Sequence, residues 1–201
     1  QLFGGGDFLN MPYAYRLDGR LDVPALQRTI AEIVRRHAAL RAGFRDTADG
    51  PRQFVGRSVK MKLPLIDLAG LPRREREDSL EQISKQDAAQ TFDLEKPPLI
   101  RTKLLRLAGT QHILLVTTHH IISDQWSMGV FRRELAALYE AFSNGRSSPL
   151  PDLSVQFNDF VRWQNELLKN GYFDRQISYW RERLHPPSSA LEFRRGRNKK
   201  P

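Results

Sequence analysis

The chain has 201 residues, of which 40% are hydrophobic and 27% charged, the balance of a folded globular protein rather than a disordered chain. It contains no cysteine, which excludes disulfides and thiolate metal sites and is consistent with a reducing cytosol. The formal net charge is +9, yet basic and acidic residues are interspersed except at residues 194–200, so we expect no nucleic-acid binding.

The N-terminus lacks the basic and apolar regions of a signal peptide, and no run approaches the ~18 apolar residues of a membrane span. We therefore expect a soluble cytoplasmic protein with no membrane contact. The surplus positive charge suits docking of an acidic partner, because complementary fields speed encounter.

The first quarter of the sequence alternates predicted strands with one amphipathic helix. Residues 13–17 are a predicted strand, and Asp22 and Pro24 mark a helix start, because aspartate caps free backbone amides and proline is tolerated in the first turn. Residues 40–45 and 53–55 are predicted strands around a turn. The helical positions that recur at spacings of three and four, and so share one buried face, are Leu26, Ile30, Ile33, Val34 and His37.

The middle of the sequence predicts a charged helix followed by a hairpin. The helix is expected at residues 72–90, on the surface, because it has few apolar positions. Residues 99–107 and 112–118 are rich in β-branched and apolar side chains and form a predicted hairpin. Its second strand leads directly into His119 and His120, which therefore lie at a strand end.

Beyond Asp124 the pattern predicts one further helix, a proline-containing linker at residues 149–151, and two more helices. The fold class that follows is α+β, a two-layer sandwich of helices on a mixed, largely antiparallel sheet. We expect residues 1–185 to form one lobe and residues 186–201, rich in Pro, Ser and Arg, to form a basic tail or linker.

The segment from His119 to Asp124 concentrates titratable groups where a strand ends. A single histidine beside an apolar strand is most often a core or cap residue, but two adjacent ones followed by aspartate favour chemistry. A zinc site needs three or four ligands, and no further cluster of His, Cys or Glu is near in the sequence, so no metal is expected. A hydrolase triad is disfavoured because Ser123 lacks the Gly-x-Ser-x-Gly elbow.

Three sequence segments, in the right order, resemble motifs of condensation domains in nonribosomal peptide synthetases. Residues 118–127 (Thr-His-His-Ile-Ile-Ser-Asp-Gln-Trp-Ser) resemble HHxxxDG, and residues 36–44 (Arg-His-Ala-Ala-Leu-Arg-Ala-Gly-Phe) resemble RHExLRTxF with Ala38 in place of Glu. Residues 157–163 resemble YxDFAxW, although Phe160 is expected in the core because it lies on an amphipathic helix. Three ordered matches make a chance resemblance improbable.

The resemblance implies a lobe like that of chloramphenicol acetyltransferase. It begins near residue 10 and runs to the tail, which is about half of a complete condensation domain. In this family two similar lobes meet in a V, and the active site lies in the tunnel between them. The missing C-terminal lobe would follow Pro201, so we expect the isolated half to be inactive.

The resemblance also implies roles for individual residues. His120 matches the second motif histidine, whose neutral imidazole can accept the ammonium proton or hydrogen-bond the attacking amine; the two alternatives stay open. His119 is expected to shape the loop. Asp124 is expected to be mainly structural and to be held by Arg41, with Arg36 as a second candidate, in a bidentate ion pair.

The family glycine after the aspartate is replaced by Gln125, which is expected to alter the acceptor pocket without abolishing activity. Gln125, Trp126 and Ser127 are expected along the substrate tunnel. Trp126, Trp180 and the three methionines are assigned to packing.

The implied function is amide (peptide) bond formation between a carrier-bound acyl or peptidyl thioester donor and a carrier-bound aminoacyl acceptor. The expected partners are donor and acceptor peptidyl carrier proteins, an adjacent adenylation domain and the C-terminal lobe; phosphopantetheine belongs to the carriers, and this chain is expected to bind no cofactor of its own.

Three alternatives stay open. An epimerisation domain shares HHxxxDG, but there Ser typically precedes Trp, whereas Trp126 precedes Ser127 here. A coenzyme A-dependent HxxxD acyltransferase is the second. The third is a noncatalytic module that docks carrier proteins. A heterocyclisation domain is disfavoured because it has aspartates in place of the histidine pair.

Overall fold

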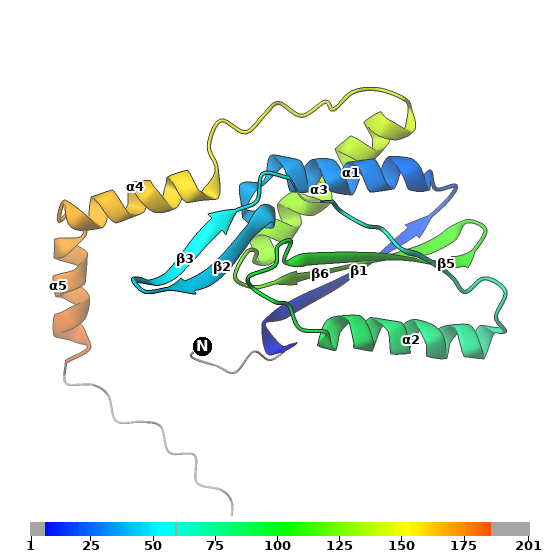
Figure 1. Cartoon of the computed structure of the whole chain (residues 1–201), viewed down its shortest axis with the longest axis horizontal. Coiled ribbons are helices and arrows are strands. Elements are labelled where there is room, and N and C mark those ends of the chain that lie inside the picture. Colours follow the sequence, from blue (N-terminus) through cyan, green and yellow to red (C-terminus); the bar gives the residue numbers. More distant parts are fainter. Residues whose placement is uncertain (1–6, 59, 186–201) are drawn as a thin grey trace, which may run out of the picture. The chain divides into compact units, whose positions relative to one another are not determined.

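The computed structural model describes residues 7–58 and 60–185 (Figure 1). The chain divides into two compact units, Gln1–Asn158 and Asp159–Pro201. The first contains both sheets and the histidine motif. The predicted boundary at residue 185 coincides with the end of the described residues, and the tail at 186–201 lies outside them, so that boundary stays a prediction.

A four-stranded sheet forms the centre of the first unit. Its strand order is β1-β6-β5-β4, in which β6 pairs antiparallel with both β1 and β5, and β4 pairs parallel with β5. The mixed, largely antiparallel sheet predicted from the sequence is thereby confirmed. Its strands are β1 (Asn10–Asp18), β4 (Leu65–Asp67), β5 (Ile100–Ala108) and β6 (Gln111–His119).

Helices α1 (Val23–Arg36) and α3 (Gln125–Ser143) cover one face of this sheet (Figure 1). Asp22 caps α1 by accepting a hydrogen bond from the amide of Ala25 at 2.9 Å, as predicted. The main core lies between these helices and the sheet. Its fully buried side chains include Leu26, Ile30 and Ile33 of α1, Leu104 and Leu114 of the sheet, and Leu138 of α3.

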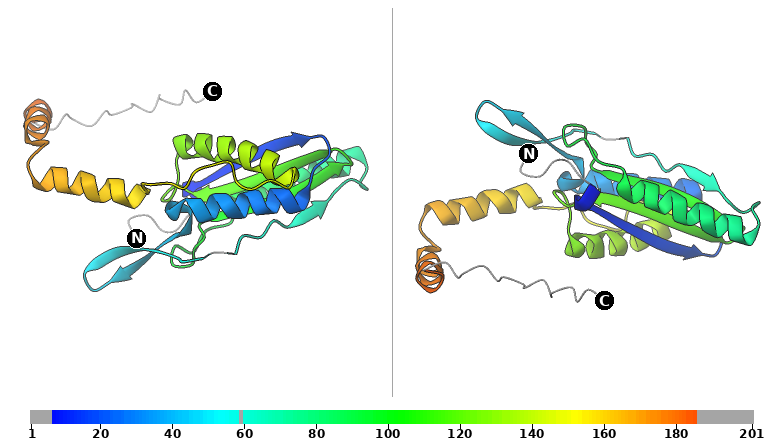
Figure 2. Two further views of the ribbon diagram at one scale, coloured as in Figure 1. Left: turned by 90° about the horizontal axis from the view of Figure 1, so that it is seen from above. Right: turned by 90° about the horizontal axis from the view of Figure 1, so that it is seen from below.

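Helix α2 (Arg73–Ala89) covers the opposite face of the sheet, as the two views in Figure 2 show. Half-buried Leu80 and Ile83 pack there against the buried Leu105 and Leu115. Near the end of the helix Asp87 is buried, and its carboxylate accepts a hydrogen bond from the Thr117 hydroxyl at 2.5 Å. The α+β class is confirmed, and α2 adds helical cover on the second face of the sheet.

The hairpin of β2 (Ala42–Thr47) and β3 (Gly50–Val55) forms a separate two-stranded sheet. Gly50 has a φ of +98°, a conformation that favours glycine and permits the tight reversal. The predicted strand at 40–45 begins later than expected, because Leu40 and Arg41 belong to a short 3-10 helix, η2 (Ala38–Arg41), that follows α1. A second short 3-10 helix, η1 (Asp7–Leu9), precedes β1.

The remaining helices are α4 (Phe157–Lys169), which begins in the last two residues of the first unit, and α5 (Asp174–Arg183). Both were predicted. Neither buries a side chain among the described residues: Phe160 is 43% exposed, so its assignment to the core is wrong for this chain, and Trp180 is also exposed.

Candidate active site

His119 is the last residue of β6 and is buried, with 7% of its surface exposed. Its backbone amide donates to the carbonyl of Leu99 at 2.9 Å, and its Nδ1 accepts a hydrogen bond from the amide of Ile121 at 3.1 Å. The ring of Phe92 lies edge-on to it. Burial, and then the neighbouring His120, lower the pKa of His119, which favours a neutral imidazole. The His119 imidazole thus bonds to the backbone of the turn after β6, and its role in shaping the loop stays a prediction.

His120 lies in this turn and is exposed. Its amide donates to the carbonyl of Leu9 at 2.8 Å, and its Nδ1 lies 3.0 Å from the carbonyl oxygen of Ser123. Because a carbonyl can only accept, Nδ1 must bear the hydrogen. The neutral ring then has its lone pair on Nε2, which is the nitrogen able to accept a proton from a substrate.

A buried pair of hydroxyls closes the turn around His120. The Oγ of Ser123 donates to the Oγ1 of Thr118 at 2.6 Å, and both residues are buried. In the sequence, Ser123 stands out only as a possible nucleophile. Its hydroxyl instead fixes the loop, and the carbonyl of the same residue sets the tautomer of His120.

Asp124 is the N-cap of α3. Its Oδ1 accepts hydrogen bonds from the amide of Ser127 at 2.8 Å and from the hydroxyl of Ser127 at 2.6 Å, and the Ser127 hydroxyl also accepts from the Asp124 amide. The hydrogen bond from the Ser127 hydroxyl is the largest cause of the lowered pKa of Asp124, and the hydrogen bond from the Ser127 amide is the second. Asp124 is thus an ionised cap at the positive end of a helix, a structural role.

The arginines expected to hold Asp124 have other partners. Arg36 forms an ion pair with Glu134, with Nε 3.3 Å from Oε2. Arg41 donates to the carbonyl of Gly56. The predicted ion pair between Asp124 and either arginine does not form within the described part of the chain, because Arg36 lies opposite the middle of α3 rather than its first turn. The expectation that Arg41 or Arg36 holds Asp124 is therefore wrong.

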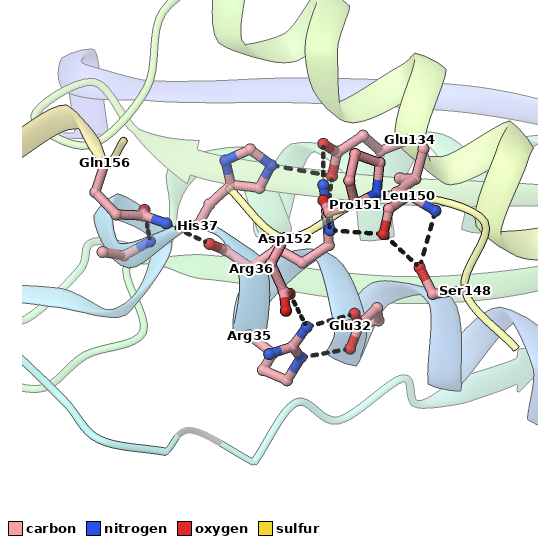
Figure 3. A network of polar contacts seen from close by, with 11 residues as sticks. Glu32, Arg35, Arg36, His37, Glu134, Ser148, Leu150, Pro151, Asp152 and Gln156 are labelled. Atoms are coloured by element: carbon pink, nitrogen blue, oxygen red, sulfur yellow. Dashed lines mark hydrogen bonds and ion pairs between the residues drawn. The ribbon is translucent and has the colours of Figure 1, made fainter. Parts of the chain in front are cut away.

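The Arg36–Glu134 pair is the centre of a wider polar network that joins the end of α1 to α3 and to residues 148–156 (Figure 3). Arg36 also donates to the carbonyl of Pro151 at 2.8 Å. The amide of Gln156 donates to the Arg36 carbonyl at 3.0 Å, and its oxygen accepts from the Ala38 amide at 2.9 Å. No sequence pattern predicts this network, since Arg36 and Glu134 lie 98 positions apart.

A cavity of about 500 Å³ lies beside His120 in the first unit. Trp126 and Ser127 line it, and their place along a substrate tunnel stays a prediction. Trp126 is 80% exposed, so its assignment to packing is wrong. Among the methionines, Met61 and Met128 are buried as expected. The apolar side chains of the wall include Ile33, Leu40, Ile100, Met128, Val130 and Phe131.

Gln125 lies outside this cavity. Its Oε1 accepts a hydrogen bond from the hydroxyl of Tyr13 at 3.0 Å, so the side chain is directed toward β1. An effect of Gln125 on acceptor choice stays a prediction, and it would act on the β1 side of the helix start.

The described residues contain no group of three or more His, Cys, Asp or Glu side chains that could hold a metal ion. Within the same residues, every helix is too short or too polar to cross a membrane.

The family model named Condensation domain matches residues 1–199. The chain belongs to the condensation domain family. It is 44% identical over 205 residues to chondramide synthase cmdD of Chondromyces crocatus, with 96% of this chain and 5% of the synthase aligned.

Solved structures share the fold of this chain. The X-domain from teicoplanin biosynthesis superposes with a TM-score of 0.81 at 32% identity, covering 94% of this chain and 42% of that one. The starter condensation domain of rhizomide synthetase RzmA superposes with a TM-score of 0.84 at 20% identity, covering 94% and 45%. This condensation-domain chain therefore spans less than half of these solved chains and a small part of the synthase.

Proposed function

We propose that the condensation domain to which this chain belongs forms an amide bond between a donor acyl or peptidyl thioester and the amine of an aminoacyl acceptor. The observation on which the proposal rests is the geometry of His120. Its Nδ1–H is bound to the Ser123 carbonyl, so Nε2 presents a lone pair beside a cavity that can hold part of a substrate.

The chemistry requires one proton acceptor. The acceptor nitrogen attacks the thioester carbonyl, a C–N bond forms, the C–S bond breaks, and the donor's thiol leaves with a proton. The Nε2 of His120 accepts a hydrogen bond from the attacking amine and can take the proton that it loses. Holding both substrates in this geometry supplies much of the rate enhancement.

The substrates would arrive on peptidyl carrier proteins through phosphopantetheine, a group that belongs to the carriers. An adenylation domain would load them, and a second lobe would complete the tunnel. The known relatives are far longer than this chain, which supports a multidomain setting. The net charge of +9 suits an acidic carrier. We place the reaction in the cytoplasm, in line with the absence of cysteine.

The test loads donor and acceptor groups onto separate carriers and measures the amide product with the condensation domain that contains this chain. We expect His120→Ala to lower the rate by roughly 100-fold or more, the usual contribution of a general base. His185→Ala is a matched control, because it removes an exposed imidazole from the second unit. Equal rates for His120→Ala and His185→Ala would refute the proposed role of His120.

A second function is a protein-docking domain without turnover. It is favoured by the teicoplanin X-domain, which has been solved in complex with OxyB. The same carrier assay discriminates the two functions, because a docking domain binds loaded carriers and forms no product. An epimerase would change the configuration of the donor residue instead, and a coenzyme A-dependent acyltransferase would accept free coenzyme A thioesters.

A further inference from the structure

The cavity beside His120 contains few polar atoms that could meet a ligand. Its walls are mainly apolar, and most of its polar side chains bond to one another. The Ser123 hydroxyl binds Thr118, and the Asp124 carboxylate binds Ser127. A substrate group entering this cavity therefore meets a largely apolar surface.

His37 is an exception among these lining side chains. Its Nε2 lies 3.0 Å from Oε2 of Glu134, and since a carboxylate accepts, Nε2 must bear the hydrogen (Figure 3). The same carboxylate pairs with Arg36, whose side chain is only 3% exposed, so a buried arginine holds the half-buried anchor of the imidazole in place. The His37 side chain is 25% exposed and lines the cavity.

This anchoring leaves the second ring nitrogen of His37 available. Nδ1 makes no hydrogen bond to any other described residue, and in the neutral ring it is an acceptor. A fixed acceptor in an apolar wall favours a ligand with an O–H or N–H group at the matching position, because that group otherwise loses its hydrogen bond to water on entry. A cavity of about 500 Å³ has the size of a small-ligand site.

We propose that this cavity holds the apolar side chain or acyl group of a thioester substrate and that His37 selects groups ending in a hydroxyl or amide N–H. The inference rests on the proposed function, since it names the substrate class of the same site. His37 is a specificity residue in this proposal; His120 remains the base. Glu134 and Arg36 position the imidazole.

The test uses two stable ligands that differ by one hydroxyl: the pantetheine amides of 3-phenylpropanoate and 3-(4-hydroxyphenyl)propanoate. Their affinities for this chain are measured by calorimetry. We expect the hydroxylated amide to bind roughly two- to tenfold more tightly, the range that one net hydrogen bond supplies. In His37→Phe the two affinities should become equal.

The control is His112→Phe, the same substitution of a buried imidazole that does not line this cavity. It should retain the preference. A measurement on the unaltered chain covers the case in which His37→Phe does not fold: the ¹⁵N resonance of His37 Nδ1 should move more on adding the hydroxylated amide than on adding the phenyl amide.

Three other outcomes would each overturn the inference. Equal affinities and equal ¹⁵N shifts in the unaltered chain would overturn the inference, as would a preference that survives His37→Phe. Failure of both amides to bind would also overturn it. The carrier assay judges the amide-forming function separately, because product formed with phenyl and hydroxyphenyl donors at equal rates leaves that function intact while refuting selection by His37.

Discussion

The carboxylate of Asp124 accepts two hydrogen bonds from Ser127, one from its backbone amide and one from its hydroxyl. The motif aspartate thereby begins α3 directly after the loop that contains His120. Its contribution to the site is to fix where the helix starts, and this role leads to a stability prediction that differs from that of a catalytic carboxylate.

Replacing Asp124 by alanine should lower the free energy of unfolding by about 1 kcal/mol, the usual cost of losing a helix cap. Asp124→Asn should retain most of the stability, because asparagine caps as well as aspartate. Urea denaturation followed by circular dichroism measures both. If the asparagine variant were fully stable yet inactive in the carrier assay, the charge of Asp124 would have a direct chemical role.

Removing Arg36 should be far more costly. Arg36→Met removes the buried cation and leaves the half-buried carboxylate of Glu134 without it, and breaking a buried ion pair typically costs roughly 3–5 kcal/mol. Arg35→Met is the matched control on the next residue: its side chain is exposed and its ion pairs with Glu32 and Asp152 should contribute at most about 1 kcal/mol. Similar losses for the two variants, measured by denaturant unfolding, would contradict the importance of this network.

The free energy of unfolding should decrease as the pH is lowered through the range where histidine titrates. Burial lowers the pKa of His119 below its usual 6.5, so the unfolded chain binds this proton more readily than the folded chain. The contribution of His119 to the free energy of unfolding is therefore complete above pH 6.5 and decreases as the pH falls below that value. It becomes constant once the pH is below the pKa of His119 in the folded chain. The pKa of His112 is lowered in the same direction, by burial first and then by Arg106.

The measurement is the slope of unfolding free energy against pH from about 7.5 to 5. His119→Gln and His112→Gln should each flatten the slope, whatever each does to stability at neutral pH, and the two reductions should add because the sites lie at opposite ends of β6. A slope that stays the same in His119→Gln would refute the lowered pKa.

Gln125→Gly should change which acceptors are used while keeping turnover. The substitution removes both the side chain and its hydrogen bond from Tyr13. Tyr13→Phe separates these effects, because it removes the hydrogen bond and opens no space at position 125. Competition between acceptors in the carrier assay should shift in Gln125→Gly and stay constant in Tyr13→Phe. The same acceptor ranking in Gln125→Gly and the unaltered chain would exclude a role for position 125.

Local patterns were sufficient for most of the fold. Asp22 and Pro24 predict the start of α1, and the cap hydrogen bond to Ala25 forms as expected. The hairpin of β5 and β6 is likewise predicted within one residue at its ends. These features depend on neighbours in the sequence, so composition and spacing suffice to find them.

Long-range partners were not predictable in the same way. Arg36 and Glu134 are 98 positions apart, and no periodicity or motif connects them. Family resemblance suggested Arg41, or Arg36, as the partner of Asp124, whereas the amide and hydroxyl of Ser127, three residues further along α3, satisfy that carboxylate. The size and hydrophobicity of Trp126 did not predict its position either, because a large apolar side chain is as compatible with the exposed wall of a cavity as with a core.

The exposed indole of Trp126 at the cavity gives the protein an optical reporter of its own. Tryptophan emission moves to shorter wavelength when water leaves the ring, so a substrate group entering the cavity would register as a blue shift without any attached dye. The chain has three tryptophans, and replacing Trp163 and Trp180 by phenylalanine would leave Trp126 as the single emitter. Substrate entry could then be followed in real time, separately from bond formation.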